Sequence, residues 1–243
     1  MGASSIALVV LAGCATVRGR PEPPDPAVAR AAWEQRVPQD FRGSAAFAYV
    51  EEDPALPRVL IIGDSISIGY TPVVRELLAG RANVLRIPVN GGPTTRGLEQ
   101  IEDWLGTGHW DVIHFNWGLH DLWRATEPDG ENRVPIDQYE RNLDALVQRL
   151  KRTKAKLIWA STTPVPEGAR HRVAGDAARY NVAAAAVMKE QHVPTDDLYG
   201  AVVGDLGAYQ RPADVHFTEN GSAFLGERVA AEISKALGRR RRR

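Results

Sequence analysis

The feature that most constrains the fold is an alternation, from about residue 58 onwards, of short apolar runs with stretches of helical periodicity. The apolar runs are nearly continuous, as is typical of parallel strands buried on both faces. The alternation predicts a three-layer α/β/α sandwich, in which helices cover both faces of a central parallel sheet of about five strands. We expect strands at 59–62, 84–88, 112–116 and 157–160, a weaker strand at 193–198, and helices at 71–80, 96–105, 136–152, 173–191 and 219–237.

The remaining segments flank this predicted core. A chain of 243 residues suits one α/β domain. We expect that domain to cover 29–238, with its core at 58–237 and an extra helix and strand within 29–57. A basic tail, 239–243, follows Gly238, which suits a helix C-cap. Since 30 Lys and Arg balance 30 Asp and Glu, the net charge is zero, which argues against nucleic-acid binding through bulk charge.

The N-terminal segment carries the only cysteine of the chain, which excludes an internal disulfide and a Cys-rich zinc site. An apolar run at 6–12 is too short to span a bilayer and leads into Leu11-Ala12-Gly13-Cys14. This resembles a bacterial lipoprotein signal, although no Lys or Arg precedes Cys14. The resemblance implies a signal peptide at 1–13, lipidation of Cys14, and attachment to a membrane of the bacterial cell envelope, either at the periplasmic face of the outer membrane or outside the cell. A frayed apolar N-terminus is the alternative. The stretch 14–28 is rich in Pro and charge and predicts a tether.

Chemistry in a doubly wound sheet is expected just beyond the carboxyl ends of the strands. Gly63-Asp64-Ser65 follows the first expected strand, so Ser65 lies where strand turns into helix. Its hydroxyl is exposed there, and its own N–H near a helix N-terminus favours a developing anion. A helix N-cap is the alternative role for this serine. No serine has a G-x-S-x-G frame, so the nucleophile elbow of α/β-hydrolases is absent.

Three further clusters follow the expected strands or precede the last helix. Gly91 and Gly92 allow close approach of the backbone to a ligand, or form an ordinary Gly-Pro turn. The run 116–121, Asn-Trp-Gly-Leu-His-Asp, places polar groups directly after a buried strand. Asp214 lies two residues before His216, and a histidine beside a carboxylate suits a general base held in one tautomer.

The order and strand-end positions of these clusters resemble those of the SGNH hydrolases, also called the GDSL esterase and lipase family, over about 58–237. The resemblance implies a flavodoxin-like fold. Gly63-Asp64-Ser65 is similar to the block that supplies the nucleophile, and Gly92 to the glycine whose N–H donates to the oxyanion. Gly118-Leu119-His120-Asp121 is similar to the third block, and His216 to the histidine that acts as base.

Two positions depart from the family pattern. The third block normally carries an asparagine where this chain has His120, whose neutral imidazole can still donate a hydrogen bond; Asn116 is a possible substitute donor. The family's Asp-x-x-His would need a carboxylate at position 213, but Ala213 stands there. Either Asp214 or a backbone carbonyl therefore orients His216.

The resulting hypothesis is acyl transfer through a covalent serine ester. Ser65 attacks, His216 takes its proton, and the oxyanion is held by the N–H groups of Ser65 and Gly92 together with the His120 side chain. Asp64 and Asp121 are expected to hold the loops rather than react. We expect no cofactor, because the chain has neither a P-loop nor a G-x-G-x-x-G after a strand.

Substrate choice is expected to lie in the loops 122–135 and 163–172. Trp117 and Trp123 can stack on a sugar ring. Four arginines can meet an anionic polysaccharide: Arg96, Arg124, Arg170 and Arg172. The loops lack a long apolar lid pattern, which favours short acyl esters, such as acetyl groups, on a small molecule or a polysaccharide.

Three alternatives stay open. An acyltransferase can use the same triad and pass the acyl group to a sugar hydroxyl. An inactive, anchored glycan-binding protein would account for the two departures. A metallohydrolase would use His and Asp as ligands, although no H-E-x-x-H helix motif is present. Its candidate ligands are His114, His120, Asp121, Asp214 and His216.

Overall fold

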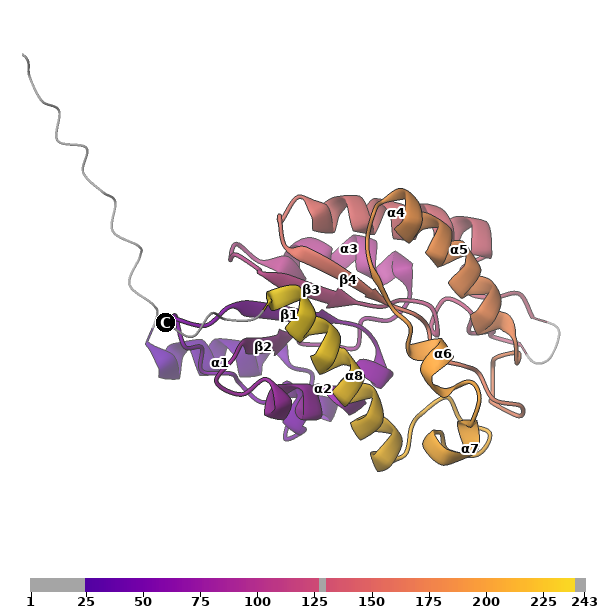
Figure 1. Ribbon diagram of the computed structural model, residues 1–243, viewed down its shortest axis with the longest axis horizontal. Coiled ribbons are helices and arrows are strands. Elements are labelled where there is room, and N and C mark those ends of the chain that lie inside the picture. Colours follow the sequence, from indigo (N-terminus) through magenta and orange to yellow (C-terminus); the bar gives the residue numbers. More distant parts are fainter. Residues whose placement is uncertain (1–24, 127–129, 239–243) are drawn as a thin grey trace, which may run out of the picture.

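In the computed structural model, which describes residues 25–126 and 130–238, five parallel strands form one sheet (Figure 1). The strands are β1 (Arg58–Ile62), β2 (Asn83–Arg86), β3 (Val112–Phe115), β4 (Lys156–Ala160) and β5 (Thr195–Asp196). Their spatial order is β2-β1-β3-β4-β5, the flavodoxin-like order. The register pairs Leu60 with Leu85 on one side and with Ile113 on the other.

Helices cover both faces of the sheet and complete the three layers (Figure 1). One face carries α2 (Ser65–Leu77) and α8 (Glu219–Leu237), which pack against each other, with α1 (Pro26–Arg36) on the same side. The other face carries α3 (Thr94–Leu105), α4 (Ile136–Lys151) and α5 (Asp176–Glu190). The three-layer α/β/α fold predicted from the sequence is thus confirmed.

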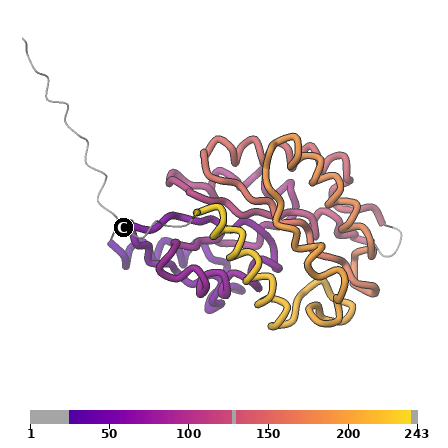
Figure 2. The backbone as a smooth tube through the Cα atoms, viewed as in Figure 1, coloured from indigo at the N-terminus to yellow at the C-terminus, as the bar shows by residue number. Residues whose placement is uncertain are grey.

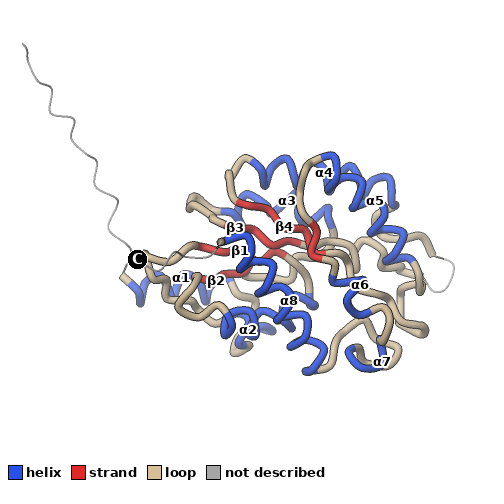
Figure 3. Tube along the Cα trace, in the orientation of Figure 1, coloured by secondary structure: helices blue, strands red, loops and turns tan. Residues whose placement is uncertain are grey.

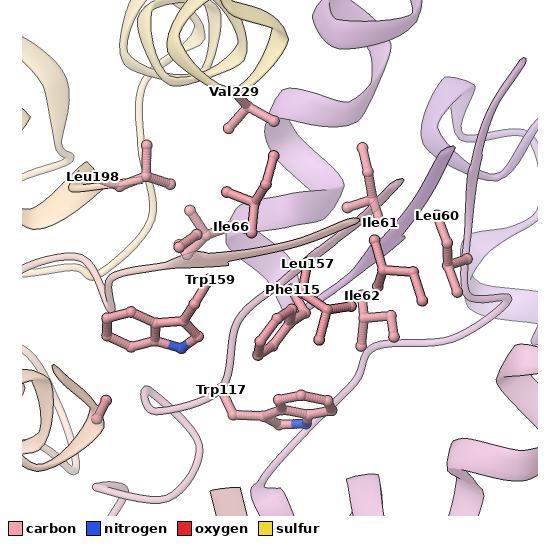
Figure 4. Packing of buried hydrophobic residues seen from close by; sticks show 14 of the residues in the cluster. Leu60, Ile61, Ile62, Ile66, Phe115, Trp117, Leu157, Trp159, Leu198 and Val229 are labelled. Atoms are coloured by element: carbon pink, nitrogen blue, oxygen red, sulfur yellow. The ribbon is translucent and has the colours of Figure 1, made fainter. Parts of the chain in front are cut away.

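The core lies where the strands meet the two helical layers. All of β3 and most of β1 are buried, which agrees with strands covered on both faces. Figure 4 shows Val229 of α8 and the ring of Trp117 approaching the strands from opposite sides. Helix α4 buries residues at spacings of three and four, which is the stripe expected of an amphipathic helix. They are Tyr139, Leu143, Leu146, Val147 and Leu150.

Helix α2 begins at Ser65, six residues before the predicted start at residue 71. Asp64 caps it by accepting a hydrogen bond from the Ile66 N–H at 2.9 Å. Pro72 therefore lies inside the helix rather than at its first turn, where proline is most easily accommodated. This correction places Ser65 at the N-terminus of a long helix.

The segment before the sheet contains α1 and two short 3₁₀ turns, η1 (Gln39–Phe41) and η2 (Ala45–Phe47), and it has no strand between residues 29 and 57. The expected extra strand is therefore wrong. Helix α1 begins at Pro26, within the last residues of the expected tether, because the Asp25 carboxylate caps it and proline suits its first position.

Two short helices, α6 (Leu198–Val202) and α7 (Leu206–Tyr209), follow β5 and were not expected from the sequence (Figures 1 and 3). The expected signal peptide 1–13, Cys14, most of the tether and the basic tail 239–243 lie outside the described residues, which Figure 2 colours along the chain. Within residues 25–126 and 130–238, no helix has the length and apolar character that crossing a membrane requires.

Candidate active site

The candidate site lies beyond the carboxyl ends of β1 and β3. These strands are neighbours, although β2 lies between them in the sequence, so the chain connections diverge at this point of the sheet. Such a switch point is where open α/β sheets bind ligands. The segment 63–65 follows β1 and the segment 116–121 follows β3, so the fold brings the two predicted blocks to one edge.

Ser65 is the first residue of α2 and is partly exposed. The helix cap is the buried Asp64, so the alternative role of Ser65 as N-cap does not hold. The Ser65 N–H makes no hydrogen bond to any other described residue. It therefore remains available at a helix N-terminus, where backbone donors and the helix dipole favour an anion.

His216 links Ser65 to a carboxylate. Its Nε2 lies 2.9 Å from Ser65 Oγ, and its Nδ1 lies 2.7 Å from Asp214 Oδ1. The same carboxylate oxygen accepts the backbone N–H of His216 at 3.1 Å. Ser65, His216 and Asp214 thus form one hydrogen-bonded chain, although the serine and the histidine are 151 positions apart in the sequence.

The loop that carries His216 is fixed on both sides of the histidine. Gln210 pairs with Phe217 in an isolated bridge, and Gln210 Nε2 donates to the carbonyl of Val215. Ala213 takes a positive φ of 53°, in the left-handed region that costs a residue with a Cβ about 1 kcal/mol. This turn directly precedes Asp214 and brings its carboxylate within hydrogen-bond distance of the His216 imidazole. The carboxylate partner therefore comes from two residues before the histidine, and none is needed at position 213.

The Asp214 carboxylate is kept ionised by its partner. Burial acts to raise its pKa, but the hydrogen bonds from the backbone and ring of His216 outweigh burial and lower the pKa below its ordinary value. An ionised Asp214 accepts from Nδ1–H and leaves Nε2 facing Ser65 as the acceptor. That tautomer is the one a general base requires.

Asp121 connects the segment after β3 with the start of α3. Its Oδ1 accepts the N–H of Thr94 at 2.9 Å and the hydroxyl of Thr94 at 2.5 Å, while its Oδ2 has no partner among the described residues. Burial raises the pKa of Asp121 to about 7 against the opposing hydrogen bonds. The carboxyl therefore holds the start of α3 in place, as expected of a loop-holding residue.

His120 is partly exposed beside these groups and hydrogen-bonds to no other described residue. Burial lowers its pKa, and three arginines nearby lower it further: Arg172, Arg133 and Arg96. Asp64 acts in the opposite direction but more weakly than burial. The imidazole is therefore neutral at neutral pH and carries one N–H that it can donate.

Gly92 and Asn116 do not have the free donors that the sequence suggested. The Gly92 N–H donates to the side-chain oxygen of Asn90 at 3.0 Å. The Asn116 amide donates to the carbonyl of Ala160 at 2.7 Å and so ties the end of β3 to β4. Asn116 is thus a supporting residue rather than a substitute oxyanion donor.

The two tryptophans differ from the expectation that both stack on a sugar. Trp117 is 1% exposed and packs against Gly97 of α3, where a Cβ would come within 2.9 Å of its ring. Its role in substrate binding is therefore ruled out, because packing between β3 and α3 buries the ring. Trp123 is partly exposed, but its ring packs against the tilted ring of His171, with 5.0 Å between the centroids, and lies under the Arg133 guanidinium at 4.4 Å.

His114 lies apart from the site. It is buried on β3, and its Nε2 lies 3.1 Å from Asp196 Oδ2. Within the described ranges, no group of three or more His, Cys, Asp or Glu side chains is placed to hold a metal ion.

Sequence reasoning missed Thr94, which fixes Asp121, and Arg133, which lies beside Trp123. Threonine at a helix start and arginine in a loop are common, so neither residue carried a signal of its own.

Comparisons with known proteins concern the family and the fold. Residues 61–224 match the model of the GDSL-like lipase/acylhydrolase family. The solved structure of the acetyl xylan esterase AlAXEase is similar with a TM-score of 0.63 at 17% identity, covering 73% of this chain and 100% of that one. The lipase/acylhydrolase from Enterococcus faecalis gives a TM-score of 0.63 at 20% identity, over 73% and 95% of the two chains.

A third similar structure is Axe2, an acetylxylan esterase from Geobacillus stearothermophilus, with a TM-score of 0.63 at 19% identity, over 77% of this chain and 97% of that one. At these identities the likeness concerns the fold. No curated protein matches the chain in sequence.

Proposed function

The chain belongs to the GDSL-like lipase/acylhydrolase family and is a serine ester hydrolase, and from this we propose that it removes short acyl groups, of the acetyl type, from a carbohydrate through an acyl-Ser65 intermediate. The observation that carries the proposal is the hydrogen-bonded chain from Asp214 through His216 to Ser65 at the carboxyl edge of the sheet. A nucleophile, a base and a group that orients the base are the parts that acyl transfer needs.

In the first half of the reaction, Ser65 Oγ attacks the ester carbonyl while His216 Nε2 accepts the hydroxyl proton. The resulting imidazolium is stabilised by the ionised Asp214, which accepts from Nδ1–H throughout. When the tetrahedral intermediate collapses, His216 returns the proton to the leaving alcohol and the acyl group stays on Ser65. Water then attacks the acyl-enzyme with His216 again as base, which releases the acid and restores the serine.

The oxyanion of each tetrahedral intermediate is proposed to meet the Ser65 N–H and the neutral His120 ring. The Ser65 N–H has no other partner among the described residues, and the His120 ring is likewise without one. The Gly92 N–H can join them only if it leaves the Asn90 side chain. Each such donor contributes on the order of 3 kcal/mol to lowering the barrier.

Two observations support a short acyl group on a carbohydrate. Structures with the same fold are described as acetylxylan and acetyl-xylooligosaccharide esterases. The segments beside the site are rich in polar and cationic side chains, among them His120, Arg133 and Arg172. A long acyl chain would need an apolar surface instead.

The test is a series of p-nitrophenyl esters of increasing acyl length, together with acetylated xylo-oligosaccharides, with product analysis. We expect acetyl esters to be hydrolysed fastest and Ser65→Ala to lower kcat by about 10⁴-fold or more. Ser234→Ala on α8 is the matched control, since it removes one hydroxyl near the opposite edge of the sheet. Unchanged hydrolysis in Ser65→Ala would defeat the mechanism, and faster turnover of long-chain esters would defeat the acyl preference. Transfer of the acyl group to a sugar hydroxyl instead of water would point to the acyltransferase alternative.

A further inference from the structure

Three arginines from separate segments converge on the loop that carries His120. Arg172 donates from Nε to the carbonyl of Leu119 at 2.9 Å. Arg133 donates its backbone N–H to the carbonyl of Trp123 at 2.8 Å. Arg96, on the first turn of α3, lies so close to Gly92 that a Cβ there would meet its Cδ at 3.2 Å. The Arg172 side chain thus contacts the residue before His120, the Arg96 side chain lies against Gly92, and the Arg133 guanidinium lies over the Trp123 ring.

The positive charges of the three arginines all act on the His120 imidazole. Each of the three guanidinium groups lies close enough to His120 to lower the pKa of its imidazole, after the larger effect of burial. Burial, together with repulsion from Arg133, lowers the pKa of Arg172. Positive charges held together at a partly buried site repel each other and favour an anion between them.

None of the three has a carboxylate partner within the described parts of the chain. Asp64 and Asp214 act on Arg172 only from a distance. The carboxylate of Asp64 caps α2, and that of Asp214 is bound to His216.

Arg124 differs from these three, although the sequence placed it with Arg96 and Arg172. It is paired with Asp176 at 2.9 Å and with the side chain of Asn132 at 2.7 Å. Some arginines elsewhere in the fold are paired in the same way, as Arg58 is with Glu52, whereas others, such as Arg75, donate to backbone carbonyls. Arg96, Arg133 and Arg172 thus differ from Arg124 in having no carboxylate partner among the described residues.

Trp123 holds one of these cations in place. The Arg133 guanidinium lies over its ring with 4.4 Å to the centroid, a cation–π contact. The ring also packs against the tilted ring of His171, whose carbonyl accepts the backbone N–H of Arg124. Trp123 thus positions a guanidinium rather than offering a free face to a sugar.

We infer that the ester hydrolysed at Ser65 is carried on an acidic saccharide, and that Arg172 and Arg133, with Arg96 on the oxyanion side, bind the carboxylate or sulfate group of that saccharide. This inference rests on the proposed function. Guanidinium groups match the paired oxygens of such anions, and among the described residues Arg172 makes a hydrogen bond from Nε while neither terminal nitrogen has a partner. The positive site also attracts a negatively charged polymer before contact.

The experiment compares kcat/KM for acetate release from three substrates: acetylated galacturonate oligosaccharides, acetylated sulfated xylo-oligosaccharides and neutral acetylated xylo-oligosaccharides. We expect the wild-type enzyme to prefer the acidic substrates by about tenfold or more. Arg172→Gln should lower this preference by about tenfold, and the exposed Arg133→Gln by about threefold. Arg133→Lys should retain part of it, and Arg141→Gln, which changes an exposed arginine on α4, should leave it unchanged.

Ionic strength provides an independent readout. Raising the salt concentration from about 0.01 M to about 1 M shortens the screening length about tenfold, so kcat/KM for the acidic substrates should fall while that for the neutral one stays level. Arg133→Gln should weaken this salt dependence, and because that side chain is exposed the variant should fold as the wild type does, which circular dichroism checks.

Two results would overturn the inference. The first is equal kcat/KM for acidic and neutral substrates in a wild-type enzyme that still hydrolyses p-nitrophenyl acetate through Ser65. The substrate would then not be an acidic saccharide, but the proposed function would stand. The second is a preference for acidic substrates that is unchanged in Arg172→Gln and Arg133→Gln, which would show that these residues do not cause it. If the wild-type enzyme hydrolyses neither p-nitrophenyl acetate nor any glycan ester, the proposed function fails and the inference fails with it.

Discussion

Two of the histidine–aspartate pairs among the described residues lie in contrasting surroundings. In one, His216 Nδ1 lies 2.7 Å from Asp214, and the two side chains are 46% and 38% exposed. In the other, His114 Nε2 lies 3.1 Å from Asp196, and both side chains are fully buried. The hydrogen-bond geometry is similar, but only the first pair has a serine hydroxyl at its free nitrogen.

The difference indicates which surroundings suit such a pair for the proposed proton transfer. His216 has its second ring nitrogen at 2.9 Å from Ser65 and is open to solvent, so a substrate can reach it. His114 has its Nδ1 buried without a partner in the described structure and lies at the edge of the Tyr70 ring. A buried pair of this kind joins β3 to β5 and stabilises the sheet, whereas the exposed pair can exchange a proton with a substrate.

The largest expected difference between the two pairs is the effect of removing their aspartate on activity. Asp214→Ala removes the acceptor that fixes the His216 tautomer and stabilises its imidazolium, so we expect kcat to fall by about 10²- to 10⁴-fold. Steady-state kinetics on p-nitrophenyl acetate measures this, with Asp137→Ala on the exposed face of α4 as the control. A loss of less than threefold would mean that a backbone carbonyl orients the ring instead.

The second effect is on stability. Asp196→Ala leaves the buried Nε2 of His114 without a partner, and we expect the free energy of unfolding to fall by about 3 kcal/mol. Urea unfolding measures this loss, and Asp214→Ala should show a much smaller one because its pair is exposed. The folded Asp196→Ala enzyme should keep its kcat. A loss of kcat as large as in Asp214→Ala would contradict the assignment of the buried pair to the core.

The smallest effect concerns Asp121, a buried carboxyl with no histidine partner. Its pKa is about 7 in the folded protein and near 3.8 when unfolded. Between these values the folded state holds a proton that the unfolded state has lost, so this contribution to stability is present below about pH 4 and is lost as pH rises to about 7. Asp121→Asn cannot titrate, and its unfolding free energy should therefore depend less on pH in that window. Equal pH profiles for the two proteins would show that Asp121 is already ionised.

The sheet was predictable from the sequence because strands buried on both faces read as nearly continuous apolar runs. The N-terminal segment was predicted in part, since the expected helix is present as α1, whereas two 3₁₀ turns stand where a strand was expected. The start of α2 was missed because proline usually marks a first turn, whereas Pro72 lies within this helix.

The catalytic candidates Ser65 and His216 were predictable because each follows a strand or precedes a helix in a characteristic order. Their partners depend on backbone conformation that sequence patterns do not encode. The positive φ of Ala213 decides that Asp214 reaches the ring, and the turn at Asn90 occupies the Gly92 N–H. Trp117 was misassigned because its burial depends on Gly97 of α3, a contact between segments 20 residues apart in sequence.

The most direct test of the central claim is covalent labelling of the native enzyme with a serine-directed phosphonate, followed by peptide mass spectrometry. We predict one adduct, on Ser65, with hydrolytic activity lost in proportion to labelling, and much slower labelling of Asp214→Ala than of Asp196→Ala once both are folded. An adduct on another serine, or full hydrolytic activity after complete labelling of Ser65, would contradict the assignment of Ser65 as the nucleophile.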